Sequence, residues 1–414
     1  MRQGDFWKFL SGETISVFGS AFTSFALPLL VYQITHSPIN LAFDAAAGSL
    51  SYLFFGLIGG AFADRVNRKR LMMSMDILNA LTISTIPLLF LLHTLPVWWI
   101  YMVSFLMTTW TILFQAANAA APPSLVPQDK LIEANSRLMT AFVAASLLGS
   151  PLAGIVFGIM PVPNALLFDA ASYIISFIAL LSIRTSFNTP YGSVESEQTQ
   201  VQPQKQTLRQ DIIEGLRYIW QQPVIRLIVL FLVSINFING VVFAELIFFA
   251  KTQLHASNFQ YGLLVAAGSI GIIFSSLAAK WIRQRLAFGP IAIYALGLAS
   301  IAFTLFALTS TPWLALPLWL VRAGLFALVD VNIISLRQTI VPNRLLGRVV
   351  TTSRVLYNLV SLVGTLLGGY LVAVTNATLV FVIVGIGTLL LCIGFLFTPL
   401  GTMHQNIQAQ TSTT

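Results

Sequence analysis

The sequence has little charge and almost no cysteine, and each shortage excludes a class of protein. Only 9% of the 414 residues are charged, while 57% are apolar. A soluble domain carries roughly 25% charged residues, so a large water-facing surface is excluded. The single cysteine, Cys392, excludes a disulfide framework, a thiolate zinc site and Cys-pair redox chemistry.

The sequence also lacks the motifs of common enzymes. There is no Gly-rich phosphate loop ending in Lys-Ser/Thr, so ATP is not expected to be the energy source. Three of the four histidines, His36, His93 and His255, fall in or beside expected outer loops, and His404 lies in the tail. No His/carboxylate metal site or Ser-His-Asp set is assembled, so neither catalysis nor a cofactor is expected. The net charge of +8 forms no patch that would bind nucleic acid.

Long apolar runs dominate the sequence. A helix needs about 20 apolar residues to cross ~30 Å of hydrocarbon, and twelve runs of that length can be found. They lack the alternation of a membrane β-barrel, so we expect an all-α membrane protein with twelve transmembrane helices. The expected spans are 11–34, 41–63, 71–92, 97–121, 138–160, 164–184, 224–250, 259–282, 286–309, 313–334, 350–374 and 377–398.

The basic residues predict the orientation. If the N-terminus is cytoplasmic, nearly all of the 22 Lys and Arg residues fall in inner segments, with Lys251 outside and Arg322 inside a span. This bias follows the positive-inside rule. We therefore expect a multi-pass protein of the cytoplasmic membrane with both termini in the cytoplasm.

The longest polar stretch divides the spans six and six. Within it, 208–220 has apolar residues at helical spacing, which is typical of an amphipathic helix on the inner membrane surface. Leu125-Val-Pro and Ile340-Val-Pro occupy corresponding positions of the two halves, as in a transporter built from two pseudo-symmetric six-helix bundles. The expected domains are an N-terminal bundle (1–184), a cytoplasmic linker (185–223), a C-terminal bundle (224–400) and a cytoplasmic tail (401–414).

One inner loop carries a family resemblance. It is similar to the loop signature of the major facilitator superfamily, with Asn67 in place of the usual Gly. The resemblance covers essentially the whole chain. Asp64 is expected to cap a helix N-terminus, and the basic residues to pair with acids or lipid phosphates. The signature residues are Gly60, Asp64, Arg65, Arg68, Lys69 and Arg70.

A branch of the superfamily is also suggested. The opening at 6–16 and the two Val-Pro loops resemble bacterial exporters that include macrolide-efflux proteins and siderophore exporters. Gly149, Pro151, Gly154 and Gly158 are similar to the Gly-Pro motif of the drug:proton antiporter branch, without its paired Gly before Pro. Close helix packing also explains these glycines, and the two interpretations are compatible.

Charges at span depth are candidate functional residues because burying them is costly. Arg322 lies near the midplane, and Glu245 lies about a turn nearer the outside. We predict an Arg322–Glu245 pair that binds substrate or responds to protonation; a permanent neutralising pair is equally compatible with the sequence.

The remaining acids have several interpretations. Glu13 is a candidate for carrying a coupling proton, or is a water-exposed interfacial residue. Asp330 is expected to pair with the basic cluster at Lys280–Arg285 rather than bind substrate. Asp44 and Asp169 are expected in first helical turns, where the dipole favours an anion, and Asp76 in an inner-face charge network.

Uncharged polar residues could line a pathway. Gln115, Asn236 and Asn239 are candidates, although such residues more often form interhelical hydrogen bonds.

The resemblance implies a secondary-active exporter of amphiphilic small molecules, exchanging substrate for protons by alternating access about a midplane site. The expected partners are the lipid bilayer, the substrate and protons, and a monomer is expected. A siderophore or lipid exporter is an alternative. A non-transporting scaffold or receptor is disfavoured because it needs no charge at span depth.

Overall fold

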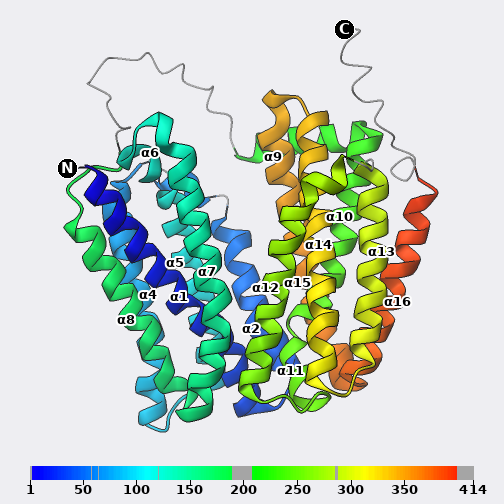
Figure 1. Ribbon diagram of the computed structural model, residues 1–414, viewed down its shortest axis with the longest axis horizontal. Helices are drawn as coiled ribbons and strands as arrows, with labels where there is room; N and C mark the ends of the chain where they lie inside the picture. The colour runs from blue at the N-terminus through cyan, green and yellow to red at the C-terminus, as the bar shows by residue number, and fades with distance from the viewer. Residues whose placement is uncertain are drawn as a thin grey trace. The chain divides into compact units, whose positions relative to one another are not determined.

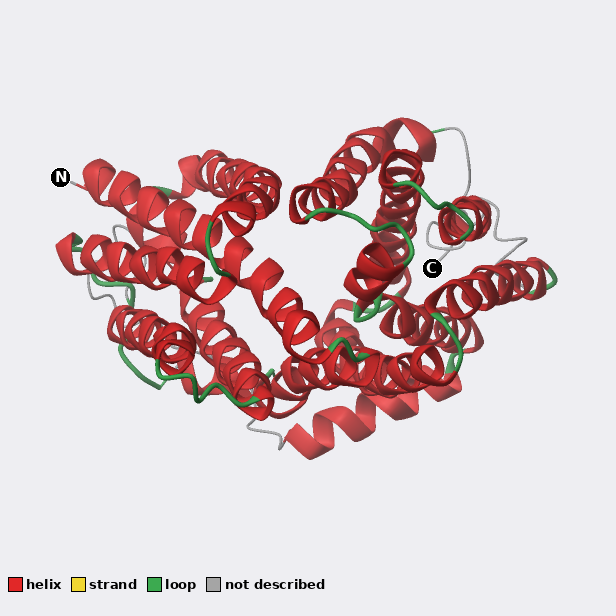
Figure 2. Cartoon of the chain, turned by 90° about the horizontal axis from the view of Figure 1, so that it is seen from below, coloured by secondary structure: helices red, strands yellow, loops and turns green. Residues whose placement is uncertain are grey.

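The chain is built from helices. The computed structural model describes residues 2–56, 58–63, 65–119, 121–188, 208–284 and 288–398. Within these ranges every regular element is helical, and loops connect the helices (Figure 2). The described part of the chain therefore has the expected all-α class.

The chain divides into two compact units. Unit 1 comprises residues 1–203 together with 257–262, and unit 2 comprises 204–256 together with 263–414. The boundary after residue 203 falls inside the segment 185–223 that the sequence assigns to a linker. Residues 189–207 of that segment, and residues 399–414 with the expected tail, lie outside the described residues.

Unit 1 is organised around the first helix, α1, which packs against α7 and α8, while α8 also packs against α4 (Figure 1). Its elements are α1 (Arg2–Thr35), α2 (Pro38–Phe55), α3 (Ile58–Ala63), α4 (Arg68–Leu91), α5 (Val97–Asn118), α6 (Ala121–Leu125), the 3-10 turn η1 (Gln128–Lys130), α7 (Leu131–Ile159) and α8 (Val162–Ser182).

Unit 2 pairs α10 with α15, and packs α13 against both α14 and α16. Its elements are α9 (Leu208–Gln221), α10 (Pro223–Phe243), α11 (Leu246–Thr252), α12 (Asn258–Arg283, whose first turn groups with unit 1), α13 (Phe288–Ala307), α14 (Pro312–Ile340), α15 (Asn343–Val374) and α16 (Ala377–Leu396).

Eleven helical stretches of the described chain are long and apolar enough to cross a membrane. Each overlaps one of the expected runs. The remaining expected run, 41–63, is divided between α2 and α3, because α2 ends at a glycine C-cap, Gly56, and further glycines follow. Glycine loses more backbone freedom in a helix than other residues, which makes this run prone to interruption.

The expected run 224–250 is also interrupted. Helix α10 ends at Phe243, and α11 begins at Leu246 after the C-cap residue Ala244 and the N-cap residue Glu245. The interruption places an acidic residue between two helical segments of one candidate span, 223–252.

Close helix packing sets the position of α10. A Cβ atom added to Gly364 of α15 would lie 2.3 Å from the carbonyl oxygen of Phe237, and one on Gly368 would lie 2.6 Å from that of Val241. Main-chain atoms cannot move away easily, so both positions require glycine. Close contact between α10 and α15 therefore depends on small residues at these two positions.

Large apolar side chains cover much of the outer surface. Phe243, Phe274 and Leu277, all on candidate spans, are 76%, 66% and 75% exposed. In water this surface would be unfavourable, whereas in hydrocarbon it costs nothing. The packing therefore agrees with a protein whose surroundings are lipid.

Candidate functional site

Arg322 lies in the interior of unit 2 among aromatic rings. Its guanidinium carbon is 4.7 Å from the ring centroid of Phe303, 4.7 Å from that of Trp319 and 5.6 Å from that of Phe326. One nitrogen, Nη2, donates a hydrogen bond of 3.0 Å to Oδ1 of Asn239 on α10. These contacts, each of the cation–π or ion–dipole type, partly offset the cost of burying the cation.

The rings beside Arg322 belong to a larger aromatic cluster. Phe303 and Phe306 are stacked with centroids 5.9 Å apart, and Phe306 lies 5.2 Å from Trp319. Phe381 of α16 and Phe249 of α11 extend the cluster, with 5.2 Å between Phe303 and Phe381 and 5.0 Å between Phe249 and Phe381. The aromatic cluster beside the guanidinium thus contains rings from four helices, α11, α13, α14 and α16.

The predicted ion pair between Arg322 and Glu245 is wrong. Glu245 is fully buried, and neither carboxylate oxygen has a hydrogen-bond partner among the described residues. The side chain that hydrogen-bonds to Arg322 is instead that of Asn239 on α10.

The other polar candidates of unit 2 lie outside this cluster. Asn236 donates a hydrogen bond of 2.8 Å to the carbonyl oxygen of Leu232 on its own helix. Asp330 is exposed on α14. Of the basic cluster expected to pair with Asp330, Arg285 lies outside the described residues, the side chain of Lys280 is not described, and Arg283 lies half-buried at the end of α12.

Unit 1 instead contains buried carboxyl groups. Oε2 of Glu13 on α1 accepts a hydrogen bond of 3.2 Å from Asn118 of α5, whereas Oε1 is buried without a partner. Asp76 on α4 is 1% exposed, and neither of its oxygens has a hydrogen bond of normal geometry among the described residues. The two carboxyl groups lie near enough for their charges to interact. Glu13 is thus a half-buried residue with one buried oxygen, and Asp76 forms no ion pair among the described residues.

Two further acids have hydroxyl partners. Asp169, which is fully buried, accepts hydrogen bonds from Thr23 of α1 and, at 3.1 Å, from Ser172 of α8. Asp44 accepts a bond of 2.5 Å from Ser104 of α5. The expectation that both acids lie in first turns was wrong, because neither α2 nor α8 has an acid in its first turn. Side-chain donors, rather than helix dipoles, hold these carboxylates.

Gln115 of α5 is exposed, and its side chain forms no hydrogen bond with the described residues. The structure therefore does not bring it to either buried cluster.

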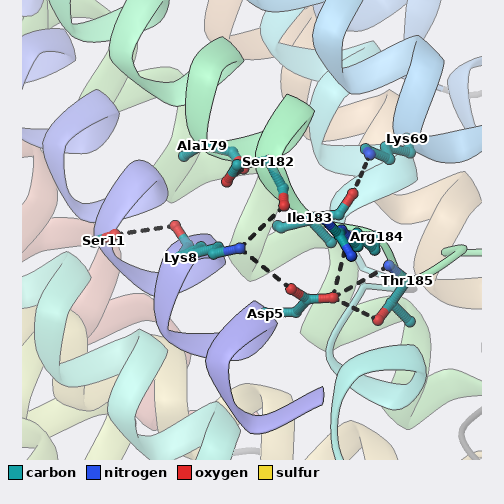
Figure 3. A network of polar contacts seen from close by, with 9 residues as sticks. All are labelled: Asp5, Lys8, Ser11, Lys69, Ala179, Ser182, Ile183, Arg184 and Thr185. Carbon is teal, nitrogen blue, oxygen red and sulfur yellow. Dashed lines mark hydrogen bonds and ion pairs between the residues drawn. The ribbon is translucent and has the colours of Figure 1, made fainter. Parts of the chain in front are cut away.

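The inner-loop signature binds the end of α8. Lys69 donates to the carbonyl oxygen of Ile183 (Figure 3), and Nη1 of Arg68 donates to that of Phe187 at 3.4 Å. Cations at a helix C-terminus are favoured by the helix dipole. Lys69 and Arg68 thus contact main-chain carbonyls at this end of unit 1, while Arg65 and Arg70 are exposed and Gly60 lies in α3.

The residue that departs from the signature has its own role. Asn67 is the N-cap of α4, and its side chain accepts a hydrogen bond of 3.0 Å from the backbone N–H of Arg70. Asp64, which was expected to cap a helix, lies outside the described residues. Asn67 therefore caps α4, and asparagine is a residue type well suited to an N-cap.

The start of α1 joins the same network. Oδ2 of Asp5 accepts hydrogen bonds from the backbone N–H groups of Arg184 and Thr185, each 3.2 Å, and from the Thr185 hydroxyl at 2.8 Å (Figure 3). Lys8 forms an ion pair of 3.7 Å with Asp5 and donates to the carbonyl oxygen of Ser182 at 3.1 Å. Three helices, α1, α4 and α8, are tied together at this end of unit 1.

The antiporter-like motif on α7 provides close packing. A Cβ atom on Gly149 would lie 2.5 Å from Cβ of Ala21 on α1, and one on Gly154 would lie 2.6 Å from the carbonyl oxygen of Asn258. Gly158 has open space around its Cβ position, and Pro151 lies within the helix. Two of the three glycines therefore have a packing requirement.

The aromatic walls around Arg322 were not identified from the sequence. The signal was present in part, since Trp319 and Phe326 lie three residues before and four residues after Arg322. Residues at these spacings are neighbours on a helix surface. Phe303 comes from another helix, and nothing in the sequence distinguishes it from the rest of the 31 phenylalanines.

Comparisons with known proteins agree with this architecture. A sequence model of the Major Facilitator Superfamily matches residues 9–352 and 236–412. The multidrug efflux pump Tap of Mycolicibacterium fortuitum is 25% identical over 394 residues, covering 92% of both proteins. Macrolide efflux protein A of Streptococcus pyogenes is 24% identical over 179 residues, covering 43% of this chain and 44% of that protein.

Solved structures share the fold. The nucleoside transporter NupG superposes with a TM-score of 0.75 at 13% identity, covering 97% of this chain and 100% of that chain. A bacterial homologue of the iron transporter ferroportin in an inward-facing state gives a TM-score of 0.72 at 16% identity, covering 95% and 98%. At such identities the likeness concerns the fold alone.

Proposed function

The chain belongs to the Major Facilitator Superfamily, a family of membrane transporters, and we propose that it exports amphiphilic small molecules in exchange for protons. The observation that carries this proposal is the similarity to the multidrug efflux pump Tap, which extends over 92% of both proteins. Because the match is not confined to one half, it supports a common transport cycle rather than a shared fragment.

The interior of unit 2 supports an amphiphilic substrate. Binding energy for such compounds comes mainly from apolar contact, and a few polar groups fix their orientation. Phe303 and Trp319 are 3% and 6% exposed and form the packed base of the site. The partly buried Phe326 offers apolar contact beside them, and Arg322 and Asn239 offer polar contacts. This combination is suited to compounds that join an apolar body to a polar group.

The interior of unit 1 supports proton coupling. Glu13 and Asp76 have carboxylate oxygens that are buried without a hydrogen-bond partner among the described residues. A carboxyl group in such a setting is best accommodated with a proton, which it can release when a conformational change admits water. Alternating access would supply that change, as it does for transporters built from two six-helix halves.

The distribution of basic residues supports a cell-membrane protein with both termini in the cytoplasm. The proposed export direction would then carry substrate from the cytoplasm to the outside.

Export is tested in a bacterial host that lacks its own drug pumps. Cells with the full chain are compared with empty-vector cells for accumulation of cationic, neutral and anionic fluorescent amphiphiles and of a macrolide. The proposal predicts lower accumulation of at least one compound, restored to the vector level by a protonophore. The exposed-pair variant Glu133→Gln is a matched expression control, because Glu133 lies in a surface ion pair with Arg137. Equal accumulation with and without the protein across the panel would refute export.

A further inference from the structure

Resting on the proposed function, we infer that Arg322 binds the carboxylate of the transported molecule, so that amphiphilic organic acids are a substrate class of unit 2. The guanidinium would form a two-point contact with the carboxylate, and the partly buried ring of Phe326 beside it would contact the apolar body. The inference names the chemical class of the substrate. It starts from the observation that Glu245, the carboxylate expected to pair with Arg322, does not do so.

The first support is the missing counter-charge. Arg322 lies at span depth on α14, and it forms no ion pair with a carboxylate of the described residues. A buried cation is normally neutralised by an acid or placed against a pathway. The neutral amide oxygen of Asn239 and three ring faces compensate only part of the charge, which leaves the site suited to an anion.

The second support is the number of available donors. A guanidinium has five N–H donors in a rigid fork, and the hydrogen bond to Asn239 uses one of them. Two nitrogens of Arg337 are buried and have no hydrogen-bond partner among the described residues. No nitrogen of Arg322 is in that situation. Because the Arg322 residue is only partly buried, its free donors remain accessible. A planar carboxylate matches the geometry of this fork.

The third support is the rigidity of the walls. Trp319 rests against α12, where a Cβ atom on Gly268 would lie 2.9 Å from Nε1 of Trp319. On the same pair of helices, a Cβ on Gly271 would lie 2.1 Å from the carbonyl oxygen of Leu320. Phe303 is held by Phe306 and Phe381. Rings packed in this way hold the guanidinium in place, so little freedom is lost when a carboxylate binds to it.

The inference is tested by binding to the purified full-length chain in detergent. The probes are 1-pyrenebutyric acid, its primary amide and 1-pyrenebutylamine, which share one aromatic body and carry an anionic, a neutral and a cationic head group. Pyrene fluorescence reports binding. The wild-type chain should bind the acid roughly tenfold to hundredfold more tightly than the amide, the difference expected for hydrogen bonds to a charged group, and bind the amine most weakly.

Two variants separate head-group recognition from folding. Arg322→Gln should remove the preference for the acid while the amide still binds, which shows that the aromatic site is intact. Asn239→Asp keeps the arginine and adds a carboxylate of the same size at its present hydrogen-bond partner. That internal carboxylate should occupy the guanidinium and likewise abolish the preference for the acid.

Arg226→Gln is the matched control. Arg226 is also an arginine of unit 2 over an aromatic ring, 5.8 Å from the centroid of Trp220, but it lies near the start of α10. Its loss should leave the order of the three probes unchanged.

Equal binding of acid, amide and amine by the wild-type chain would overturn the inference, and so would an unchanged preference for the acid in Arg322→Gln. Either result leaves export of other amphiphiles standing. Conversely, a preserved acid preference in a chain that lowers no compound's accumulation in cells would overturn the proposed function and leave the binding site intact.

Discussion

The interiors of the two units differ in how they hold their charged groups. In unit 1, Asp169 and Asp44 are bonded to hydroxyls, and the oxygens of Asp76 have no hydrogen bond of normal geometry among the described residues. Unit 2 also buries a carboxyl group without such a partner, Glu245, and in addition it holds a guanidinium, Arg322, against aromatic rings. Both units thus pack long apolar helices and bury carboxyl groups, whereas the guanidinium of Arg322 among three rings belongs to unit 2.

This difference suggests a division of roles. Hydroxyl and amide partners let an acid exist in either protonation state, which suits proton handling. Rings and one amide oxygen leave a cation with unused donors, which suits an organic anion. A symmetric pair of bundles can thus couple two different ligands without sharing one site. Each prediction below changes a buried group of one unit and compares it with a matched position.

The largest effect is expected from reversing the charge in unit 2. Arg322→Glu places a carboxylate against three ring faces, with the neutral amide of Asn239 beside it in place of a cation. An unpaired buried charge of this kind should lower the free energy of unfolding by roughly 3–5 kcal/mol. Thermal unfolding in detergent, followed by tryptophan fluorescence, measures the loss.

The control for that change is Arg226→Glu, at an arginine near the start of α10 whose ring contact with Trp220 is longer. It should cost about 1 kcal/mol at most. Equal losses at the two positions would show that Arg322 is not specially placed.

In unit 1, replacing an unpartnered acid should uncouple transport without unfolding the chain. Glu13→Gln keeps the size and the contact with Asn118 but cannot exchange a proton. We expect substrate binding to persist and protonophore-sensitive export to be lost. The measurement is dye efflux with and without a protonophore, beside Glu133→Gln. Full protonophore-sensitive export in Glu13→Gln would assign coupling elsewhere.

Removing a hydroxyl partner in unit 1 should have a moderate effect on stability. Thr23→Val deletes the donor to the fully buried Asp169 while preserving side-chain shape. Leaving a buried acceptor short of one bond should cost about 1–3 kcal/mol. Thr14→Val is the comparison, since the Thr14 hydroxyl bonds only to the carbonyl of Leu10 on its own helix. A larger loss in Thr14→Val would contradict the importance given to the buried acid.

The smallest effect is expected at Glu245. Its carboxylate contacts neither Arg322 nor any other described donor, so Glu245→Gln should leave the preference for pyrenebutyric acid unchanged within about twofold, or ~0.4 kcal/mol. Titration of the purified variant with the three pyrene probes measures it. Loss of the preference for the acid would instead support the Arg322–Glu245 pair that the sequence suggested.

The spans were predictable because hydropathy sums over some 20 residues, and errors at single positions average out. The interruptions at Gly56 and Glu245 were not, since each depends on a few residues whose effect is local. The helical class, the two-part organisation and the family followed from patterns that extend along the whole chain.

The site was only partly predictable for a related reason. A charge inside an apolar run identified Arg322 as important, because such burial is costly wherever it occurs. Its partner depended on helix rotation, which hydropathy does not determine, and so Glu245 was chosen over Asn239. Likewise the sequence could not show that Asp169 faces Thr23, since the contact joins α8 to α1.

The division of roles is tested most directly in proteoliposomes that contain the purified chain, by following pyrenebutyrate movement under an imposed pH gradient. The account predicts that the wild-type chain concentrates the acid only while the gradient lasts. It also predicts that Glu13→Gln allows movement to equilibrium without concentration, and that Arg322→Gln moves little of the acid. Concentration of the acid by both variants at the wild-type rate would contradict the account.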